Sequence, residues 1–118
     1  QFISPQKPEV SQSAGIRDVI ISVSSSKHGV TVVTENGKIN GIITDGDLRR
    51  MLMNNERISD VKASDIMSRN PKTIEKDELA KDAMKILKTH GIGQLVVTDG
   101  GKYYGIIDLH RLLDEGIN

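Results

Sequence analysis

An internal repeat is the feature that most limits what this chain of 118 residues can fold into. Residues 29–43 align without gaps on residues 93–107, an offset of 64 positions, and nine of the fifteen pairs are identical. The alignment continues upstream at the same offset, where Val10 meets Ile74. A gapless match of this kind predicts two copies of one supersecondary unit.

Each copy begins with a short extended piece that leads into a helical pattern. The extended pieces lie around residues 9–10 and over residues 73–75. Apolar side chains then recur at helical spacing: Leu79, Ala83, Ile86 and Leu87 in the second copy, and Ile16, Val19, Ile20 and Val23 in the first. This spacing predicts one amphipathic helix in each copy.

Two strands and a closing helix complete each copy. The strands are predicted at residues 30–34 and 39–43, and again at 94–98 and 103–107. Asn36-Gly37 and Gly100-Gly101 stand between them, and such dipeptides favour type I′ hairpin turns because both residues accept a positive φ. The closing helices are predicted over residues 45–53 and 109–115.

The predicted fold class is therefore α/β (α+β), built from two β-α-β-β-α repeats. A unit of about 50 residues buries too little apolar surface to be stable alone, so we expect the copies to pack sheet to sheet as a pseudo-twofold pair. The predicted boundaries are a tail at 1–7, the first copy at 8–53, a connector at 54–70 and the second copy at 71–118. Because the chain starts at Gln1 without Met, we expect a fragment of a larger protein.

Composition narrows the possible functions. Sixteen basic and sixteen acidic residues give a formal net charge of zero, which argues against nucleic acid or a membrane surface as a partner. With no cysteine there is no thiolate nucleophile and no cysteine-ligated zinc. The three histidines lack metal-ligand spacing, so we expect neither a metal nor a cofactor. No apolar run approaches the length of a membrane span, and we expect a soluble cytoplasmic protein.

The segment 41–47, which we call the first junction, carries the candidate ligand chemistry. Gly41 has no Cβ, so a ligand can approach the backbone there. Thr44 offers a hydroxyl to a phosphate, and a helix starting at Asp45 directs its free N–H groups to the same place. Asp47, one turn into the helix, can accept hydrogen bonds from a ribose diol.

A purely structural interpretation of the first junction is equally open from these residues. Thr44 and Asp47 have the spacing of a capping box, in which the carboxylate satisfies the start of a helix. Arg49 and Arg50 either reach a phosphate or belong to a solvated helix face. The base of a nucleotide could stack on a tyrosine ring or pack against aliphatic side chains, namely Val32 and its neighbours. Tyr103 and Tyr104 are adjacent on a predicted strand, so one faces the core and the other faces solvent or a partner.

The corresponding segment of the second copy, residues 105–111, is the second junction, and its chemistry differs. Asp108 stands at the position of Thr44, and a carboxylate there repels a phosphate. Arg111 stands at the position of Asp47 and cannot accept hydrogen bonds from a diol. Asp108 is predicted to be a helix N-cap, and a nucleotide held as at the first junction is not expected here.

The repeat with Gly-Ile-Ile-Thr-Asp-Gly-Asp at residues 41–47 resembles a tandem pair of CBS domains, over about residues 8–116. Within that family, residues 41–52 are similar to the first CBS copy of bacterial arabinose 5-phosphate isomerases. Further similarity lies in residues 16–20, 29–33, 65–67 and 112–116. In CBS domains the matching Thr and Asp contact phosphate and ribose, which implies those roles for Thr44 and Asp47.

The resemblance implies a parent enzyme with an N-terminal sugar isomerase domain, which converts ribulose 5-phosphate to arabinose 5-phosphate for the Kdo sugar of lipopolysaccharide. Its catalytic residues lie in that domain, so none is assigned to this chain. The implied function is a non-catalytic regulatory pair that binds a nucleotide or nucleotide-sugar, such as CMP, CMP-Kdo or an adenine nucleotide. The expected contacts are Gly41, Thr44, Asp45, Asp47, Arg50 and Val32.

Two alternatives stay open beside this interpretation. The expected partners include a second copy, in a homodimer through the CBS pairs and a higher oligomer of the parent, and in the first alternative the pair only assembles this oligomer, without a ligand. It can also belong to a different parent protein, such as a dehydrogenase, a transporter or a signalling protein. The unlike second junction favours the structural alternative, and the Thr44 and Asp47 pattern opposes it.

Overall fold

The computed structural model describes residues 3–4, 6–55, 57–78 and 80–117. The chain divides into two compact units. The first unit is Pro8–Asn70, and the second unit combines Gln1–Lys7 with Pro71–Asn118. Each unit has its own core and the β-α-β-β-α order that the repeat predicts, so this order is confirmed.

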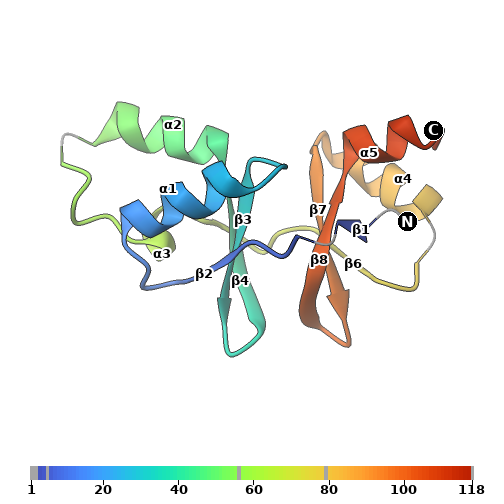
Figure 1. Ribbon diagram of the computed structural model, residues 1–118, viewed down its shortest axis with the longest axis horizontal. Coiled ribbons are helices and arrows are strands. Elements are labelled where there is room, and N and C mark those ends of the chain that lie inside the picture. Colours follow the sequence, from blue (N-terminus) through green and yellow to red (C-terminus); the bar gives the residue numbers. More distant parts are fainter. Residues whose placement is uncertain (1–2, 5, 56, 79, 118) are drawn as a thin grey trace. The chain divides into compact units, whose positions relative to one another are not determined.

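In each unit a helix follows the strand that pairs parallel with the hairpin, the hairpin follows that helix, and a second helix follows the hairpin (Figure 1). The elements of the first unit are β2 (Glu9–Ser11), α1 (Ile16–Ser25), β3 (Val30–Glu35), β4 (Lys38–Thr44), α2 (Asp45–Asn54), α3 (Ala63–Ile66) and β5 (Ser68–Arg69). Those of the second unit are β1 (Ile3–Ser4), β6 (Thr73–Glu75), α4 (Ala80–His90), β7 (Gln94–Asp99), β8 (Lys102–Asp108) and α5 (Leu109–Asp114).

The two sheets share one pattern of pairing. In the first unit β2 is parallel to β3, and β3 is antiparallel to β4. In the second unit β6 is parallel to β7, and β7 is antiparallel to β8. Each hairpin has an irregularity at the same repeat position, between Val33 and Thr34 and between Val97 and Thr98. The repeat therefore preserves the register of the strands as well as their order.

The hairpin turns adopt the conformation that their sequences predict. Asn36 and Gly37 have φ values of 53° and 81°, and Gly100 and Gly101 have values of 60° and 85°. Positive φ at both central residues is the requirement of a type I′ turn, and glycine and asparagine meet it with little strain. The turns thus fix the register that places one face of each hairpin against its helices.

Each hairpin presents one face to its two helices. In the first unit Val33 and Ile43 pack with Val19 and Val23 of α1 and Met51 of α2. In the second unit the corresponding cluster is Ile74, Ala83, Met84, Leu87, Leu95, Val97, Ile107 and Leu112. Ala83 and Leu87 were expected on this helix face and lie there, whereas Leu79 lies outside the described residues.

Two segments outside the predicted copies take part in the sheets. The sequence suggests a tail at residues 1–7, yet Ile3 and Ser4 pair antiparallel with Ile107 and Ile106. The predicted connector likewise contains α3 and β5. Ile3 and Ser4 align with Met67 and Ser68 at the repeat offset of 64, so the repeat begins earlier than its helical pattern suggests. β1 and β5 have two residues each, which is too short for the alternation of apolar and polar residues that identifies a strand in a sequence.

The two tyrosines separate as their alternation predicts. Tyr103 is 5% exposed, whereas Tyr104 is 44% exposed. The ammonium group of Lys76 lies 5.2 Å from the centre of the Tyr104 ring and 3.5 Å from Asp99 Oδ2. Asp99 is the main cause that raises the pKa of Lys76. Through Lys76, the loop that follows β6 therefore contacts the hairpin of β7 and β8 at Asp99 and Tyr104.

Glu75, at the end of β6, connects the loop after β6 to the turn between β7 and β8 by hydrogen bonds. Its carboxylate accepts hydrogen bonds from the Thr98 hydroxyl, from Gly100 N at 2.9 Å and from Gly101 N at 3.4 Å. The Thr98 hydroxyl and the Gly100 amide lower the pKa of Glu75 from its ordinary value of 4.5. The ionised form is therefore the one that the folded turn stabilises.

We expect Glu75→Gln to lower the free energy of unfolding at pH 7. Because the folded-state pKa lies below the unfolded one, the stabilising contribution is present above about pH 4.5 and is lost as the pH falls through the folded value. Urea denaturation between pH 7 and pH 3 should show the two proteins converging in acid. Glu78→Gln removes the same charge nearby and serves as the control. A gap that stays constant with pH would contradict this account.

Candidate functional site

The candidate site is built around the start of α2, where a capping box forms. Thr44 N donates to Asp47 Oδ2 at 2.9 Å, and Asp47 N donates to Thr44 Oγ1 at 3.3 Å. The Thr44 hydroxyl also lies 3.2 Å from the same carboxylate oxygen. Asp47 is only 8% exposed, although it carries a carboxylate. The structural interpretation of this spacing is thus confirmed, and the cap holds both side chains in fixed positions.

Two arginines bring positive charge to the same helix end. Arg50 forms an ion pair with Asp47 Oδ1, and its own side chain is 67% exposed. A Cβ atom placed on Gly46 would lie 3.5 Å from Arg50 Nη1 and 3.8 Å from Arg49 Nη2. Both guanidinium groups therefore reach back to Gly46, in the first turn of α2, where the helix dipole is also positive. Asp45 and Asp47 lie in the same turn, so the two arginines meet two carboxylates there.

A hollow of about 270 Å³ lies beside Asp47 and Arg50. It is lined by Asp47, Arg50, Met51, Asn54, Asn55, Asp65 and Ile66, which come from α2, the residue after it, and α3. The contribution of the connector was not expected from the sequence. Lys62 N donates to Asp65 Oδ2 at 2.9 Å, as Thr44 N does to Asp47 Oδ2. Because Lys62 lacks the hydroxyl of a capping box, the sequence carries no specific signal for this contact.

Gly41, in the first junction, lies against another segment of the chain and not against open space. A Cβ on Gly41 would lie 2.7 Å from Met67 Sδ and 2.8 Å from the backbone oxygen of Ser68. The missing side chain therefore lets β5 lie against β4, where Gly41 pairs with Arg69. Gly105 has the matching role, because a Cβ there would lie 2.9 Å from Ile3 Cγ2. The space beside Gly41 is thus occupied by β5 and is not open to a ligand.

The remaining predicted contacts lie on different sides of the junction. Asp45 is exposed, its backbone N donates to Gly29 O at 3.1 Å, and its carboxylate lies against Gly29. Val32 is fully buried and pairs with Ile42. It is absent from the cluster that its neighbour Val33 forms with α1, so its side chain is on the opposite face of the sheet. The structure thus brings Thr44, Asp47 and Arg50 together.

The second junction forms a different cap. Asp108 precedes α5, and its Oδ1 accepts a hydrogen bond from His110 N at 2.7 Å. Its predicted role as an N-cap is confirmed. Arg111, at the position of Asp47, is exposed. The pairing of a threonine hydroxyl with a buried carboxylate is thus confined to the first of the two junctions.

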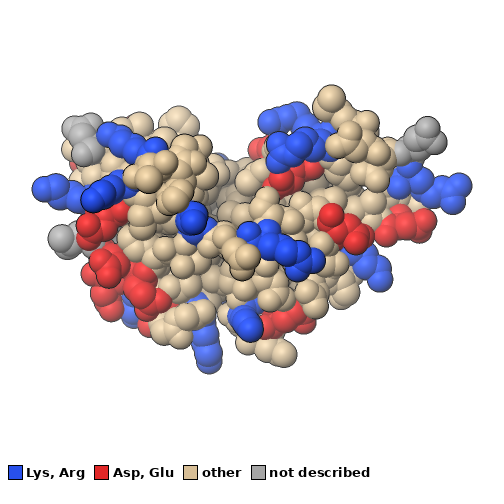
Figure 2. All heavy atoms as spheres, turned by 180° about the vertical axis from the view of Figure 1, so that it is seen from behind, with Lys and Arg blue, Asp and Glu red and all other residues tan. Residues whose placement is uncertain are grey.

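Other kinds of site receive no support from the described part of the chain. Among residues 3–4, 6–55, 57–78 and 80–117, no three His, Asp or Glu side chains gather closely enough to hold a metal ion. Across those same ranges, no helix combines the length and apolarity needed to span a bilayer. On the face shown in Figure 2, basic and acidic side chains are interspersed.

Comparison with known proteins identifies the class. The family model described as "CBS domain" matches residues 2–54 and 63–118. The chain therefore belongs to the CBS domain family and contains a tandem pair of these domains. The predicted mixed α/β fold class is confirmed by solved structures of this family, including one that covers 96% of the chain with a TM-score of 0.84.

The chain is also similar in sequence to curated bacterial enzymes of one name. The chain is 32% identical over 111 residues to the arabinose 5-phosphate isomerase KdsD of Yersinia pestis, and 38% identical over 107 residues to that of Francisella tularensis. These alignments cover 93% and 90% of the chain, but only 34% and 33% of the relatives. The chain thus spans about a third of the length of these bacterial enzymes.

Two similar solved structures contain a nucleotide. A CBS domain protein from Pyrobaculum aerophilum complexed with AMP has a TM-score of 0.85 and 18% identity, and the match covers 94% of this chain and 86% of that one. The protein CBSX2 in complex with AMP has a TM-score of 0.80 and 20% identity, covering 98% and 92%. At 18–20% identity these matches show that the chain shares the fold of the two proteins.

We expect Gly41→Ala to destabilise the chain by about 1–3 kcal/mol, because the added methyl group collides with the backbone of β5. Gly93→Ala is the matched control, since a Cβ on Gly93 meets no atom within 4 Å and its φ is ordinary. Urea denaturation of both variants and the parent chain measures the difference. Equal stability of the two variants would show that the approach of β5 does not require glycine.

Proposed function

We propose that this CBS pair is the non-catalytic regulatory part of a bacterial arabinose 5-phosphate isomerase, acting in the cytoplasm in Kdo and lipopolysaccharide biosynthesis. It binds a nucleotide or nucleotide-sugar, such as CMP, CMP-Kdo or an adenine nucleotide, at the first junction. The partner within the parent chain is a sugar isomerase domain on the amino side of the pair. The curated relatives support this parent, because they carry the same name at 31–38% identity.

The observation that carries the proposal is the grouping of Thr44, Asp47 and Arg50 at the start of α2. A buried carboxylate next to a hydroxyl suits a ribose diol, and a helix N-terminus with two guanidinium groups suits a phosphate. A nucleotide carries both groups a few ångströms apart. The AMP complexes of two proteins with the same fold support this ligand class.

Regulation follows if the ligand prefers one arrangement of the parent enzyme over another. A ligand shifts such an equilibrium only by the difference between its affinities for the two states. Since Asp47 Oδ1 is paired with Arg50, a ligand that takes this oxygen acts on an ion pair in the first turn of α2. The coupling thus begins at this ion pair.

A structural role without a ligand is the second candidate, and one observation favours it. Three large apolar side chains on the helices of the first unit are exposed: Ile21 at 52%, Leu52 at 57% and Met53 at 83%. Apolar surface of this kind suits a contact between copies, in a homodimer or in a higher oligomer of the parent. In this case the capping box serves only the helix.

Thermal unfolding in the presence of AMP, ATP, CMP and CMP-Kdo distinguishes the two candidates. A ligand that binds only the folded state at 100 times its Kd stabilises it by about 2.7 kcal/mol, which raises the melting temperature by several degrees. We expect such a rise with at least one of these nucleotides. No rise with any of them at millimolar concentration would favour the structural role.

Matched variants locate the ligand. Asp47→Ala should abolish the rise, and Arg50→Gln should weaken it for phosphorylated ligands. Asp108→Ala removes a capping carboxylate at the second junction, and we expect the ligand-dependent rise to survive it. Because both aspartate variants lose a helix cap, each is compared with its own melting temperature without ligand. A rise that persists in Asp47→Ala would place the ligand elsewhere.

A further inference from the structure

The hollow beside Asp47 extends along one face of α2 and reaches α3. Four of its lining residues share this face of α2, because they recur at helical spacing: Asp47, Arg50, Met51 and Asn54. From Asp47 to Asn54 the helix rises by about 10 Å. Asp65 and Ile66 of α3 line the same hollow. The hollow is therefore long enough for the sugar and the base of a nucleotide whose diol binds Asp47.

Two side chains of the hollow offer hydrogen-bond acceptors that lack a donor. Asp65 Oδ2 accepts a hydrogen bond from Lys62 N at 2.9 Å, but within the described residues no group donates to Asp65 Oδ1. Asn55 Nδ2 donates to Met51 O at 2.9 Å, and in the same part of the chain no group donates to Asn55 Oδ1. The hollow thus suits a ligand group that donates hydrogen bonds.

The charge of Asp65 determines which end of a nucleotide faces α3. A carboxylate repels a phosphate, whereas the guanidinium group of Arg50, which is paired with Asp47, attracts it. A nucleotide held by Asp47 therefore directs its base, and not its phosphate, toward α3. Met51 is buried and Ile66 is half-buried in the wall of the hollow, and their apolar groups can pack against the flat face of a base.

We infer that Asp65 is a specificity-determining residue, which selects a base with an amino group at the ring carbon where uracil and hypoxanthine carry a carbonyl oxygen. Cytosine and adenine have this amino group, and it donates hydrogen bonds to a carboxylate. The carbonyl oxygen of uracil or hypoxanthine only accepts, so it is repelled by Asp65. The inference rests on the nucleotide binding proposed above and narrows the ligand to cytosine and adenine nucleotides.

The cap of α3 accounts for only one of the two oxygens of Asp65. Lys62 N uses Oδ2, and an asparagine at this position would supply the same acceptor through its single carbonyl oxygen. The amide nitrogen of that asparagine would then replace Oδ1 and would donate where Oδ1 accepts. Asp65→Asn therefore keeps the cap of α3 and reverses the hydrogen-bonding character of the group that faces the base.

Titration calorimetry with pairs of nucleotides tests the inference on the chain as it stands. CMP and UMP form one pair, and AMP and IMP form the other, because each pair exchanges an amino group for a carbonyl oxygen. We expect the chain to bind CMP roughly ten-fold more tightly than UMP, and AMP more tightly than IMP by a similar factor. Equal affinities within both pairs would overturn the inference while leaving the proposed nucleotide site in place.

A matched pair of variants assigns the preference to Asp65. Asp65→Asn should bind UMP more tightly than CMP, since its amide nitrogen donates to the carbonyl oxygen of uracil. Asp60→Asn removes the same charge from the connector at an exposed residue that does not line the hollow, and it should keep the preference for CMP. An unchanged preference in Asp65→Asn would overturn the inference, as would the same loss of preference in both variants. Failure of all four nucleotides to bind would instead overturn the proposed function, and the inference with it.

Discussion

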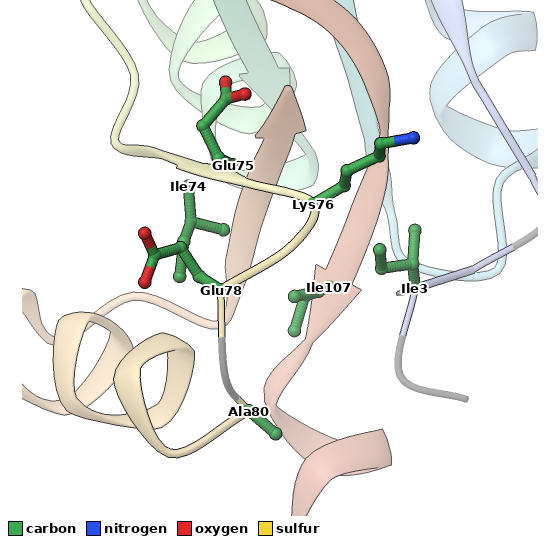
Figure 3. A pocket seen from close by; sticks show the side chains of 7 residues that line it. All are labelled: Ile3, Ile74, Glu75, Lys76, Glu78, Ala80 and Ile107. Atoms are coloured by element: carbon green, nitrogen blue, oxygen red, sulfur yellow. The ribbon is translucent and has the colours of Figure 1, made fainter. Parts of the chain in front are cut away.

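The close approach of a third segment to each hairpin is the constraint on which both units and the candidate site depend. Gly41 admits β5 to the edge of β4, and Gly105 admits β1 to β8. With β5 in place, α3 lies against the first unit, so Asp65 and Ile66 line the hollow beside Asp47. With β1 in place, Ile3 lines a hollow of about 190 Å³ together with Ile74 and Lys76 (Figure 3). A β-carbon at either glycine would disturb the surface that each segment completes.

How far the sequence predicts this fold depends on the length of each signal. The order of elements and the hairpin turns are correct because they rest on long periodic stretches and on residues that accept positive φ. The strands β1 and β5 each have two residues, too few for a period to be visible. Gly41 shows a second reason why the sequence is not sufficient. A glycine indicates that another group approaches the backbone closely, but the sequence does not say which group it is.

The two junctions show how one backbone arrangement carries different chemistry. Both end a strand of a hairpin and both start a helix with a side-chain cap. The first cap uses a hydroxyl and a carboxylate three residues apart, whereas the second uses one carboxylate and has an exposed arginine at the later position. The need for a cap therefore explains why an oxygen-bearing side chain stands at each strand end. The buried Asp47 is itself part of the first cap, and the second junction has no counterpart to it, because Arg111 stands at that position.

The cap and a bound nucleotide do not exclude each other, because the two oxygens of Asp47 have separate partners. Oδ2 serves the cap, and losing such a cap costs about 1 kcal/mol. Oδ1 is paired with Arg50, whose side chain is 67% exposed and can move into solvent. A diol that binds Oδ1 would displace this ion pair and not the cap. A ligand that takes Oδ1 thus leaves the helix start intact and releases a guanidinium group for its own phosphate.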